Sequence, residues 1–466
     1  MNSVARISGT LVILFSLVWF TPAQGGILGD FSIKDEVELG RKFNILIRSQ
    51  FPLVEDPEVT DYIQDMVDRL EAAMPPQPFP IRISVVRNNS MNAFAAPGGY
   101  LFIFTGMILG IEDESELAGV LAHELAHVSQ RHIAKQMERS QLINIGSLLG
   151  MLASAMVGEK EASTAVLFGT LAGTQSAHLK YSREDEREAD QVGMNFLVNA
   201  GYRPAGMPES FEKIRKVKWL SGGSLPAYLS THPATEERID YLRERIKKLP
   251  PEILAREDDP SRLQRIQTLL RARYTGADEA LAHFTQAKED CYNTLGESIV
   301  LSRLNRMQEA EKKFSKALSC SEKDSLFVRE AGRFFFSMGE FSRAEPLLNE
   351  AVLRNPRDLM ALFFYARLLN ETGRISEAIS YMERILRHLP EDSEVHYYMG
   401  RMQGEKGDTF LAHVHLAYSF LYRNNREKTL FHMDRARQLA GKKGSPEVLE
   451  RLERIYEERS EFWAEK

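Results

Sequence analysis

The sequence predicts a mainly helical α+β protein, in which a domain with a small β-sheet is followed by an all-α solenoid of helix pairs. Short strand patterns at residues 81–86 and 101–105 stand among helical patterns in the first half of the chain. In the second half, small residues recur with a period of 34, as expected for stacked helix pairs. A chain of 466 residues is too long for one ordinary core, so several domains are expected.

The first 25 residues have the pattern of a secretory signal peptide. Arg6 supplies the positive charge, residues 9–20 form an apolar run of 12, and small residues follow Thr21. This run is short for a membrane span, so a cleaved signal (1–25) is favoured over an uncleaved anchor. No cysteine lies near the cleavage region, which argues against a lipoprotein. The mature chain is therefore expected to be exported, and its net charge of −6 argues against nucleic acid as a main partner.

The segment 91–100, Met-Asn-Ala-Phe-Ala-Ala-Pro-Gly-Gly-Tyr, leads from the first strand into the second strand at 101–105. Helical spacing at 34–50 and 57–74 precedes both strands. The second strand is either an exposed edge or part of an internal hairpin. As an edge beside a catalytic site, it would bind an extended peptide as a further strand. The residues that this interpretation assigns to substrate binding are Asn92, Gly98, Gly99, Tyr100 and Leu101.

A metal-binding motif, His-Glu-Leu-Ala-His, lies at 123–127 within a helical pattern over about 115–139. Two histidines four residues apart on a helix differ by about 40° around its axis, so both imidazoles point the same way. Zinc peptidases use this spacing to hold the metal and to place a glutamate beside its water. We therefore expect His123 and His127 as ligands and Glu124 as general base, although the motif alone also occurs by chance.

The charged stretch 182–190 contains candidates for the third ligand, which must come from another helix. Glu186 and Asp190 share one helical face. Spacing alone equally allows Asp185 or Glu188, and a run of charge is usually a solvated helix face.

Residues 142–177 are mainly apolar and small, with a charged interruption at 158–161. Each apolar run is slightly too short to span a bilayer comfortably. The runs are either packed core helices, which is the simpler interpretation, or a helical hairpin that contacts a membrane surface or covers the active site.

Three further histidines fall in the first domain, which we expect to cover residues 26–255. His132 lies nine residues after His123, about 180° around a continuous helix, so it cannot join the metal and is expected to be a structural hydrogen-bonding residue. His178 has no evident partner. His232 is left with three roles: a helix cap, an additional ligand or a transition-state donor.

A repeat pattern begins near Cys291. The small residues in register are Ala310, Ala344, Ala378, Ala412, Gly339, Gly373 and Gly407. Small residues at helix crossings with a period of 34 predict tetratricopeptide repeats. We expect this domain at 256–440 and a polar capping helix within 441–466. Cys291 and Cys320 fall at one end of the same predicted helix pair, which is compatible with a disulfide in an exported protein; two free buried thiols are the alternative.

Four segments together resemble the HtpX and CAAX-prenyl-protease type of zinc peptidase. They are LAHELAHVSQRH (121–132), SREDEREAD (182–190), MNAFAAPGGY (91–100) and STHPATEER (230–238). The resemblance implies a gluzincin-type metallopeptidase domain with one Zn²⁺. It implies Glu186 as third ligand, since the family's acidic ligand lies four residues before the Asp of an Ala-Asp pair, and Asp190 as the partner that orients a ligating histidine. It also implies that His232 takes the fourth position in a resting, self-inhibited state.

The mechanism expected from this resemblance has Glu124 as base, with His232 or Arg238 helping to stabilise the oxyanion. The order of signal peptide, peptidase and repeats is similar to that of periplasmic proteases of Gram-negative bacteria that help assemble or degrade outer-membrane β-barrel proteins. It implies a periplasmic zinc endopeptidase, peripheral to the outer membrane, that acts in quality control and assembly of outer-membrane proteins. The expected partners are unfolded or misassembled outer-membrane proteins and, through the repeats, their assembly machinery. The alternative is a repeat-containing chaperone or adaptor whose protease activity is latent or secondary.

Overall fold

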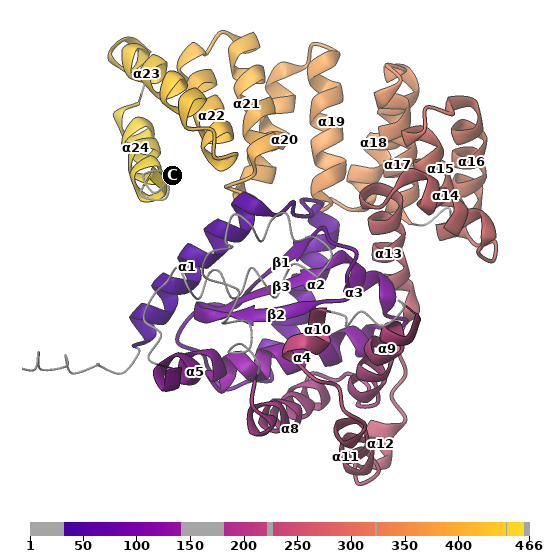
Figure 1. Ribbon diagram of the computed structural model, residues 1–466. Coiled ribbons are helices and arrows are strands. Elements are labelled where there is room, and N and C mark those ends of the chain that lie inside the picture. Colours follow the sequence, from indigo (N-terminus) through magenta and orange to yellow (C-terminus); the bar gives the residue numbers. More distant parts are fainter. Residues whose placement is uncertain (1–31, 141–180, 221–226, 322–323, 444, 461–466) are drawn as a thin grey trace, which may run out of the picture.

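The computed structural model describes residues 32–140, 181–220, 227–321, 324–443 and 445–460, and Figure 1 shows how their helices and strands are arranged. The predicted signal peptide and the apolar stretch 142–177 lie outside the described residues. The predicted fold class is confirmed: a mainly helical domain with a small mixed sheet is followed by an all-helical region. Among the described residues, no helix is long and apolar enough to cross a membrane.

A three-stranded sheet forms the centre of the first domain. Strand β3 (Tyr100–Phe104) pairs in parallel with β1 (Arg82–Val86) and antiparallel with β2 (Ala93–Ala96), so the strand order is β1-β3-β2. The hypothesis that the strand after Gly99 is an exposed edge is therefore wrong. The short 3-10 turn η1 (Pro97–Gly99) folds the chain back, so that β3 pairs with β2 on one side and receives β1 on the other.

Alternating side chains of the strands face two hydrophobic layers, because successive residues of a strand point to opposite sides. Phe94 and Phe102 stack with ring centroids 5.1 Å apart and pack against Phe43 of α1 (Ile33–Gln50). On the other face, Leu101 and Ile103 join the core built with α2 (Pro57–Glu71) and α4 (Glu114–Ser129). The sheet thus separates α1 from the motif helix α4.

Helix α4 is buried along nearly its whole length, and Asp113 caps its N-terminus by accepting a hydrogen bond from the backbone N–H of Glu116. The prediction of one continuous helix through residue 139 is wrong. The chain leaves α4 after Ser129, passes through Arg131 with a left-handed φ of 52°, and starts α5 (His132–Ser140). Arg131 donates to Glu36 of α1 at 2.9 Å, which holds the break in place.

Helices α8 and α9 pack against α4, and α11 packs against α8 and α9 (Figure 1). The bounds of the remaining elements before the repeats are α3 (Thr105–Gly110), α8 (Arg183–Asn199), α9 (Gly206–Leu220), α10 (Ala227–Thr231), α11 (Glu236–Ile246) and α12 (Pro251–Leu254).

The repeats form successive helix pairs that arch over the first domain (Figure 1). Their bounds are α13 (Pro260–Tyr274), α14 (Ala277–Gln286), α15 (Cys291–Arg303), α16 (Met307–Cys320), α17 (Ser325–Ser337), α18 (Phe341–Arg354), α19 (Leu359–Glu371), α20 (Ile375–His388), α21 (Ser393–Lys406), α22 (Thr409–Tyr422), α23 (Arg426–Lys443) and α24 (Pro446–Ser460).

The register glycines follow the first helix of each pair. Gly339, Gly373 and Gly407 have φ values of 75°, 83° and 95°, where a residue without Cβ is least strained. Asn305 takes the same position one period earlier, with φ 60°. Asparagine tolerates this conformation better than most residues, so the sequence can change there without loss of the turn.

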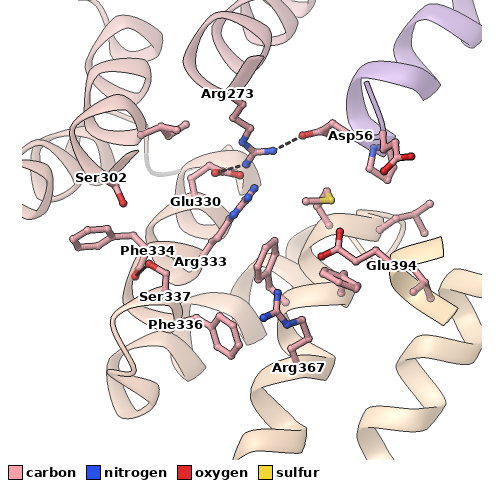
Figure 2. A pocket seen from close by; sticks show the side chains of 18 of the residues that line it. Asp56, Arg273, Ser302, Glu330, Arg333, Phe334, Phe336, Ser337, Arg367 and Glu394 are labelled. Atoms are coloured by element: carbon pink, nitrogen blue, oxygen red, sulfur yellow. Dashed lines mark hydrogen bonds and ion pairs between the residues drawn. The ribbon is translucent and has the colours of Figure 1, made fainter. Parts of the chain in front are cut away.

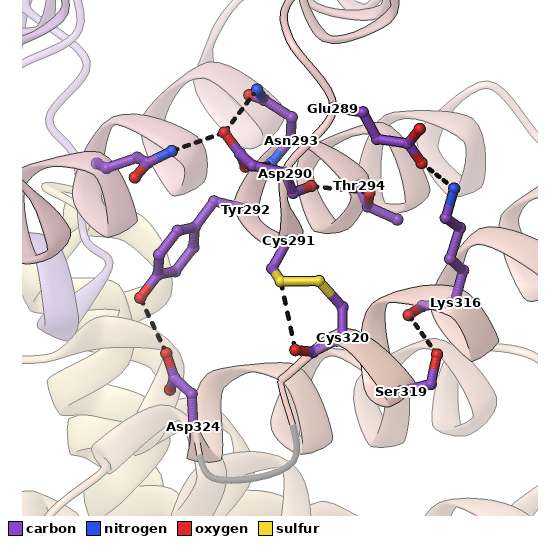
Figure 3. Close-up of a disulfide and its surroundings, with 11 residues drawn as sticks. Glu289, Asp290, Cys291, Tyr292, Asn293, Thr294, Lys316, Ser319, Cys320 and Asp324 are labelled. Atoms are coloured by element: carbon purple, nitrogen blue, oxygen red, sulfur yellow. Dashed lines mark hydrogen bonds and ion pairs between the residues drawn. A yellow bond between two sulfur atoms is a disulfide. The ribbon is translucent and has the colours of Figure 1, made fainter.

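Cys291, the first residue of α15, and Cys320, the last of α16, are joined by a disulfide with their Cα atoms 5.6 Å apart (Figure 3). The bond ties the two helices of one pair at a single end. The predicted boundaries at 255 and 440 stay predictions. Helix α23 runs past residue 440 to Lys443, and α24 packs against α22 and α23.

The N-terminus of α2 contacts the concave side of the arch. Glu58 forms ion pairs with Arg265 and with Arg329, whose side chain is fully buried. Asp56 pairs with Arg273. Beside these pairs, a cavity of about 1100 Å³ is lined by residues of both domains, among them Arg333 and Arg367 (Figure 2).

Candidate metal centre

The two motif histidines of α4 place their Nε2 atoms 3.1 Å apart. Both side chains are buried, as is Glu124 between them. The arrangement follows from the 3.6-residue helical period, which puts positions 123 and 127 on one face. This face points toward α8.

Helix α8 begins with a capping box, in which Ser182 accepts from the backbone N–H of Asp185 and the carboxylate of Asp185 accepts from the N–H of Ser182. Asp185 is therefore used by the cap, and Glu188 is exposed on another face. Glu186 instead points at the motif, with Oε1 3.4 Å from Nε2 of His127 and Oε2 3.7 Å from Nε2 of His123. Of the acids that spacing left open, Glu186 is the one that the fold brings to the two histidines.

Gly193 lies where α8 packs against α4, and its lack of a side chain lets the two helices come into close contact. A Cβ on Gly193 would lie 2.8 Å from the carbonyl oxygen of Ala122, a distance that real side chains do not adopt. The prediction from sequence did not include this glycine, which lies one turn beyond the charged stretch.

His232 follows α10 and completes the cluster. Its Nδ1 lies 2.8 Å from Oε1 of Glu186 and 3.3 Å from Nε2 of His123, while its Nε2 lies 3.7 Å from Oε1 of Glu124. The Tyr228 ring stacks on the His232 ring with centroids 4.8 Å apart. Donor atoms of His123, His127, Glu186 and His232 all lie within 4.8 Å of one another.

These donors fit zinc. In a tetrahedral site with metal–ligand bonds of about 2.0–2.1 Å, neighbouring donor atoms lie about 3.3 Å apart. Five of the six pairs among these side chains have donor atoms 2.8 to 3.7 Å apart, and all four donors lie within 4.8 Å of one another. Imidazole nitrogen with carboxylate oxygen is a donor set that zinc favours. Beside them, Oε1 of Glu124 is buried and accepts no hydrogen bond within normal geometry from the residues that the structure describes.

The charges of the buried groups are set by their neighbours. Burial holds the pKa of His127 well below its ordinary value, so its imidazole stays neutral, as a ligand must. Burial would raise the pKa of Glu186, but His232 and Arg238 outweigh it and hold this pKa well below the usual range. Burial raises the pKa of Glu124, against the opposing effects of His232 and His123. A raised carboxyl pKa suits a group that must accept and release a proton near neutral pH.

Asp190 and Arg238 hold the cluster from outside. Oδ1 of Asp190 lies 3.0 Å from Nδ1 of His123. Arg238 of α11 donates to both oxygens of Asp190, at 2.7 and 2.8 Å, and also to Glu186. Tyr241 donates to Asp190 as well. The hypothesis that Arg238 meets the substrate oxyanion is therefore corrected: its guanidinium is buried on the two carboxylates and positions them.

Two side chains that sequence reasoning did not place at the site lie against His127. Nδ1 of His132 is 2.9 Å from Nδ1 of His127, and the Tyr181 ring centroid is 3.9 Å from that of His127. His132 was expected on the opposite side of a continuous helix. The break at Arg131, which no glycine or proline announces, turns it back toward its neighbour.

The outer edge of β2 faces the catalytic glutamate candidate. Ala95 donates its backbone N–H to Oε2 of Glu124 at 3.1 Å, pointing away from β3. The predicted substrate-binding residues lie elsewhere: Tyr100 and Leu101 are in the central strand, while Gly98 approaches the backbone of Val37. Gly99 approaches the carbonyl oxygen of Pro80, and the carbonyl of Asn92 accepts from Phe104 within the sheet.

Two histidines and a glutamate that converge beside a buried glutamate define the site of a zinc metallopeptidase domain. Residues 54–246 match the model of peptidase family M48, and residues 335–402 match a tetratricopeptide repeat.

Two curated relatives with similar sequences are both named as beta-barrel assembly-enhancing proteases. A Vibrio cholerae serotype O1 protein, named as a candidate beta-barrel assembly-enhancing protease, is 33% identical over 341 residues, which are 72% of this chain and 64% of that protein. The beta-barrel assembly-enhancing protease of Escherichia coli (strain K12) is 32% identical over 241 residues, 51% of this chain and 49% of that protein. The chain thus spans about half to two thirds of the length of these relatives.

Solved structures match part of the chain with low TM-scores. YrrB, described as a TPR protein with an unusual peptide-binding site, is 20% identical, and the match covers 37% of this chain and 91% of that chain with a TM-score of 0.30.

Proposed function

We propose that this chain is a zinc-dependent endopeptidase of the periplasm that acts on unfolded or misassembled outer-membrane proteins. The observation that carries the proposal is the position of Glu124. One oxygen is held by the N–H of Ala95 at the edge of β2, and the other lies beside the four-donor cluster and accepts no hydrogen bond from the residues that the structure describes. A buried base, a substrate-binding edge and a metal site then meet at one point.

An extended substrate would add to β2 rather than to β3. In an antiparallel strand, N–H and C=O of alternate residues point to the same side. Since Ala95 points away from β3, Ala93 does so too. The N–H of Ala95 is bonded to Glu124 in this structure, so an incoming strand would use the other outward backbone groups of this edge or displace that bond. Only an unfolded segment can pair in this way, which suits a quality-control enzyme.

The reaction needs a base, a proton donor and a site for the oxyanion. Zinc, when bound, lowers the pKa of a water molecule and polarises the scissile carbonyl. Glu124 accepts the proton of the attacking water and returns it to the leaving amine. The hydroxyl of Tyr228 is buried without a hydrogen-bond partner among the described residues. It could therefore donate a hydrogen bond to the oxyanion, the role first considered for Arg238.

His232 would keep the resting enzyme closed. Its Nδ1 lies among the donor atoms and its Nε2 faces Glu124, so it takes the place that substrate and water need. Displacement of His232 would then open the site. His232→Ala should raise proteolysis if His232 inhibits, and should lower it if His232 is catalytic.

The proposed clients come from two lines of support: the names of the relatives, and the secretory signal predicted at 1–25. The repeats would bind the outer-membrane assembly machinery, and the cavity between the domains would receive part of a partner. The chain would lie at the periplasmic side of the outer membrane, and contact of 142–177 with its surface stays a prediction. An adaptor with secondary protease activity remains the second candidate, since the repeat arch makes up nearly half of the chain.

The test uses the purified mature chain, with zinc content and casein cleavage as readouts. Glu124→Gln should retain zinc and lose cleavage, while Glu252→Gln on the exposed helix α12 serves as a control and should change neither. An active Glu124→Gln variant, or wild type that binds no zinc, would disprove the enzymatic proposal. Expression of Glu124→Gln in a deletion strain separates the adaptor role: rescue of outer-membrane protein assembly would establish it without proteolysis.

A further inference from the structure

The two histidines of the motif differ in what holds their second ring nitrogen. Nδ1 of His123 faces a carboxylate, Asp190, directly. Nδ1 of His127 faces another imidazole nitrogen, Nδ1 of His132. The far nitrogen of that ring, Nε2, lies 3.1 Å from Oε2 of Glu188, whose side chain is 46% exposed. A line of three side chains therefore runs from the ligand to the protein surface.

We propose that His132 and Glu188 form a hydrogen-bond relay that fixes the tautomer of His127 and tunes metal affinity from the surface. The inference rests on the proposed zinc site, and it names His132 and Glu188 as positioning residues that touch neither substrate nor metal.

Only one proton arrangement satisfies the geometry when His127 is a ligand. Its Nε2 lies among the donor atoms, so this nitrogen must offer a lone pair and the ring proton must sit on Nδ1. Nδ1 then donates to Nδ1 of His132, which must be the acceptor. His132 in turn carries its proton on Nε2 and donates it to Glu188. Each of the two bonds thus determines the direction of the other.

The alternative partners of His132 are weaker. Asp185 lies 3.9 Å from Nε2 of His132, beyond hydrogen-bond distance, and its carboxylate already caps α8. His132 itself is buried, so water does not replace either bond. Loss of an outer partner of a ligating histidine typically weakens metal binding by about 10- to 100-fold.

The experiment compares two replacements of His132 by competition with a chromogenic zinc chelator. His132→Asn places a carbonyl oxygen where Nδ1 stood and keeps an acceptor for His127. His132→Leu has similar bulk and no acceptor. Zinc affinity should fall about 10- to 100-fold in His132→Leu. It should fall less in His132→Asn, which keeps the acceptor for His127 but loses the bond to Glu188. A role in packing alone would give the opposite order, because asparagine is smaller and polar.

Glu188 is tested by Glu188→Ala and Glu188→Gln, with Glu184→Ala as the matched control on the same exposed part of α8. Glu188→Ala should weaken zinc binding, while Glu188→Gln keeps an acceptor and Glu184→Ala leaves the relay intact. Cobalt(II) spectra of the same variants report the ligand field: His132→Leu should shift them and Glu184→Ala should not.

Equal zinc affinity in wild type and His132→Leu, or equal losses in His132→Asn and His132→Leu, would overturn the relay. If His132→Leu does not fold, an unchanged affinity in Glu188→Ala overturns it instead. Failure of wild type to bind zinc would contradict the proposed function rather than the relay, so the two failures are distinguishable.

Discussion

Arg329 of α17 donates to Glu58 in the first turn of α2 at 2.5 Å, and this ion pair joins the repeat arch to the peptidase domain. Arg329 is fully buried and is also paired with Glu330 and Asp358. The side chain of Glu58 is shared with Arg265. Glu58, together with Asp56 on Arg273, therefore ties the arch to the N-terminus of α2.

Glu58→Ala should destabilise the protein by about 1.5–3 kcal/mol, because it removes charge-assisted hydrogen bonds from a buried cluster in which Arg329 and Arg265 keep other carboxylate partners. Urea unfolding followed by circular dichroism measures the change. Asp65→Ala is the control: Asp65 is exposed on the same helix and lies 3.5 Å from Arg262, so its loss should cost about 1 kcal/mol or less. Equal effects of the two substitutions would contradict a central role for Glu58.

Because Glu58 is ionised in this cluster, the stability of the folded protein should depend on pH. Burial would raise the pKa of Glu58, but Arg329 and Arg265 outweigh it and keep the pKa below its ordinary value. A depressed folded-state pKa stabilises the protein fully above the unfolded value of about 4.3, and this contribution is lost as the pH falls through the folded value.

Wild type should therefore lose more stability than Glu58→Gln between about pH 5 and pH 3, since glutamine does not titrate there. Unfolding by urea at pH 7, 5 and 3 gives the two curves. Parallel curves for wild type and variant would show that Glu58 is not held by the arginines.

Gly193→Ala should disturb the metal centre without touching a ligand. The added methyl group would meet the Ala122 carbonyl at 2.8 Å, so α8 must move away from α4. Overpacking of this kind costs about 1–3 kcal/mol, and the shift of Glu186 and Asp190 should lower zinc affinity.

Gly404→Ala, in helix α21, is the control for Gly193→Ala. Its Cβ would lie 3.6 Å from the methyl group of Ala412, an ordinary contact, so the better helix propensity of alanine should raise stability by up to about 1 kcal/mol. Zinc titration and urea unfolding of both variants measure the changes in zinc affinity and in stability. Unchanged zinc affinity in Gly193→Ala would show that the helices tolerate the added methyl group.

The disulfide should stabilise the repeat arch. Cys291 and Cys320 are 29 residues apart, and closing a loop of this length contributes about 3–4 kcal/mol by reducing the entropy of the unfolded chain. The double variant Cys291→Ser/Cys320→Ser should unfold at lower urea concentration. Reductant should lower the stability of wild type to that of the variant and leave the variant unchanged; insensitivity of wild type to reductant would contradict this.

Local patterns predicted the parts of the fold that depend on local spacing. His123, Glu124 and His127 lie on one helical face because the period of the helix places them there. The register glycines end the first helix of each repeat because the left-handed turn needs them. Long-range pairing was not predictable in this way. Which strand is the free edge was left open, because the order β1-β3-β2 depends on how the segment before Gly99 folds back.

Two errors have the same physical origin. His132 was placed on the wrong side because helical geometry was extended past Arg131, where the ion pair with Glu36 of a distant helix accompanies a left-handed residue. Arg238 was predicted to stabilise the substrate oxyanion, since it lies in the same short segment as His232. In the folded chain, Asp190 and Glu186 accept its hydrogen bonds. Partners from other elements decide the role of a long charged side chain.

The sequence by itself determined the motif pair on α4, the glutamate proposed as its base and the candidates for a third ligand, since each depends on residues within one or two turns. It also determined the repeat period, because the same small residues recur every 34 positions. Only the tertiary structure decided that Glu186 faces the pair, that β2 offers its edge to Glu124, and that His132 returns to His127. Those relationships require α8, the sheet and the break after α4 to pack together, and packing joins residues whose separation in the chain carries no periodic signal.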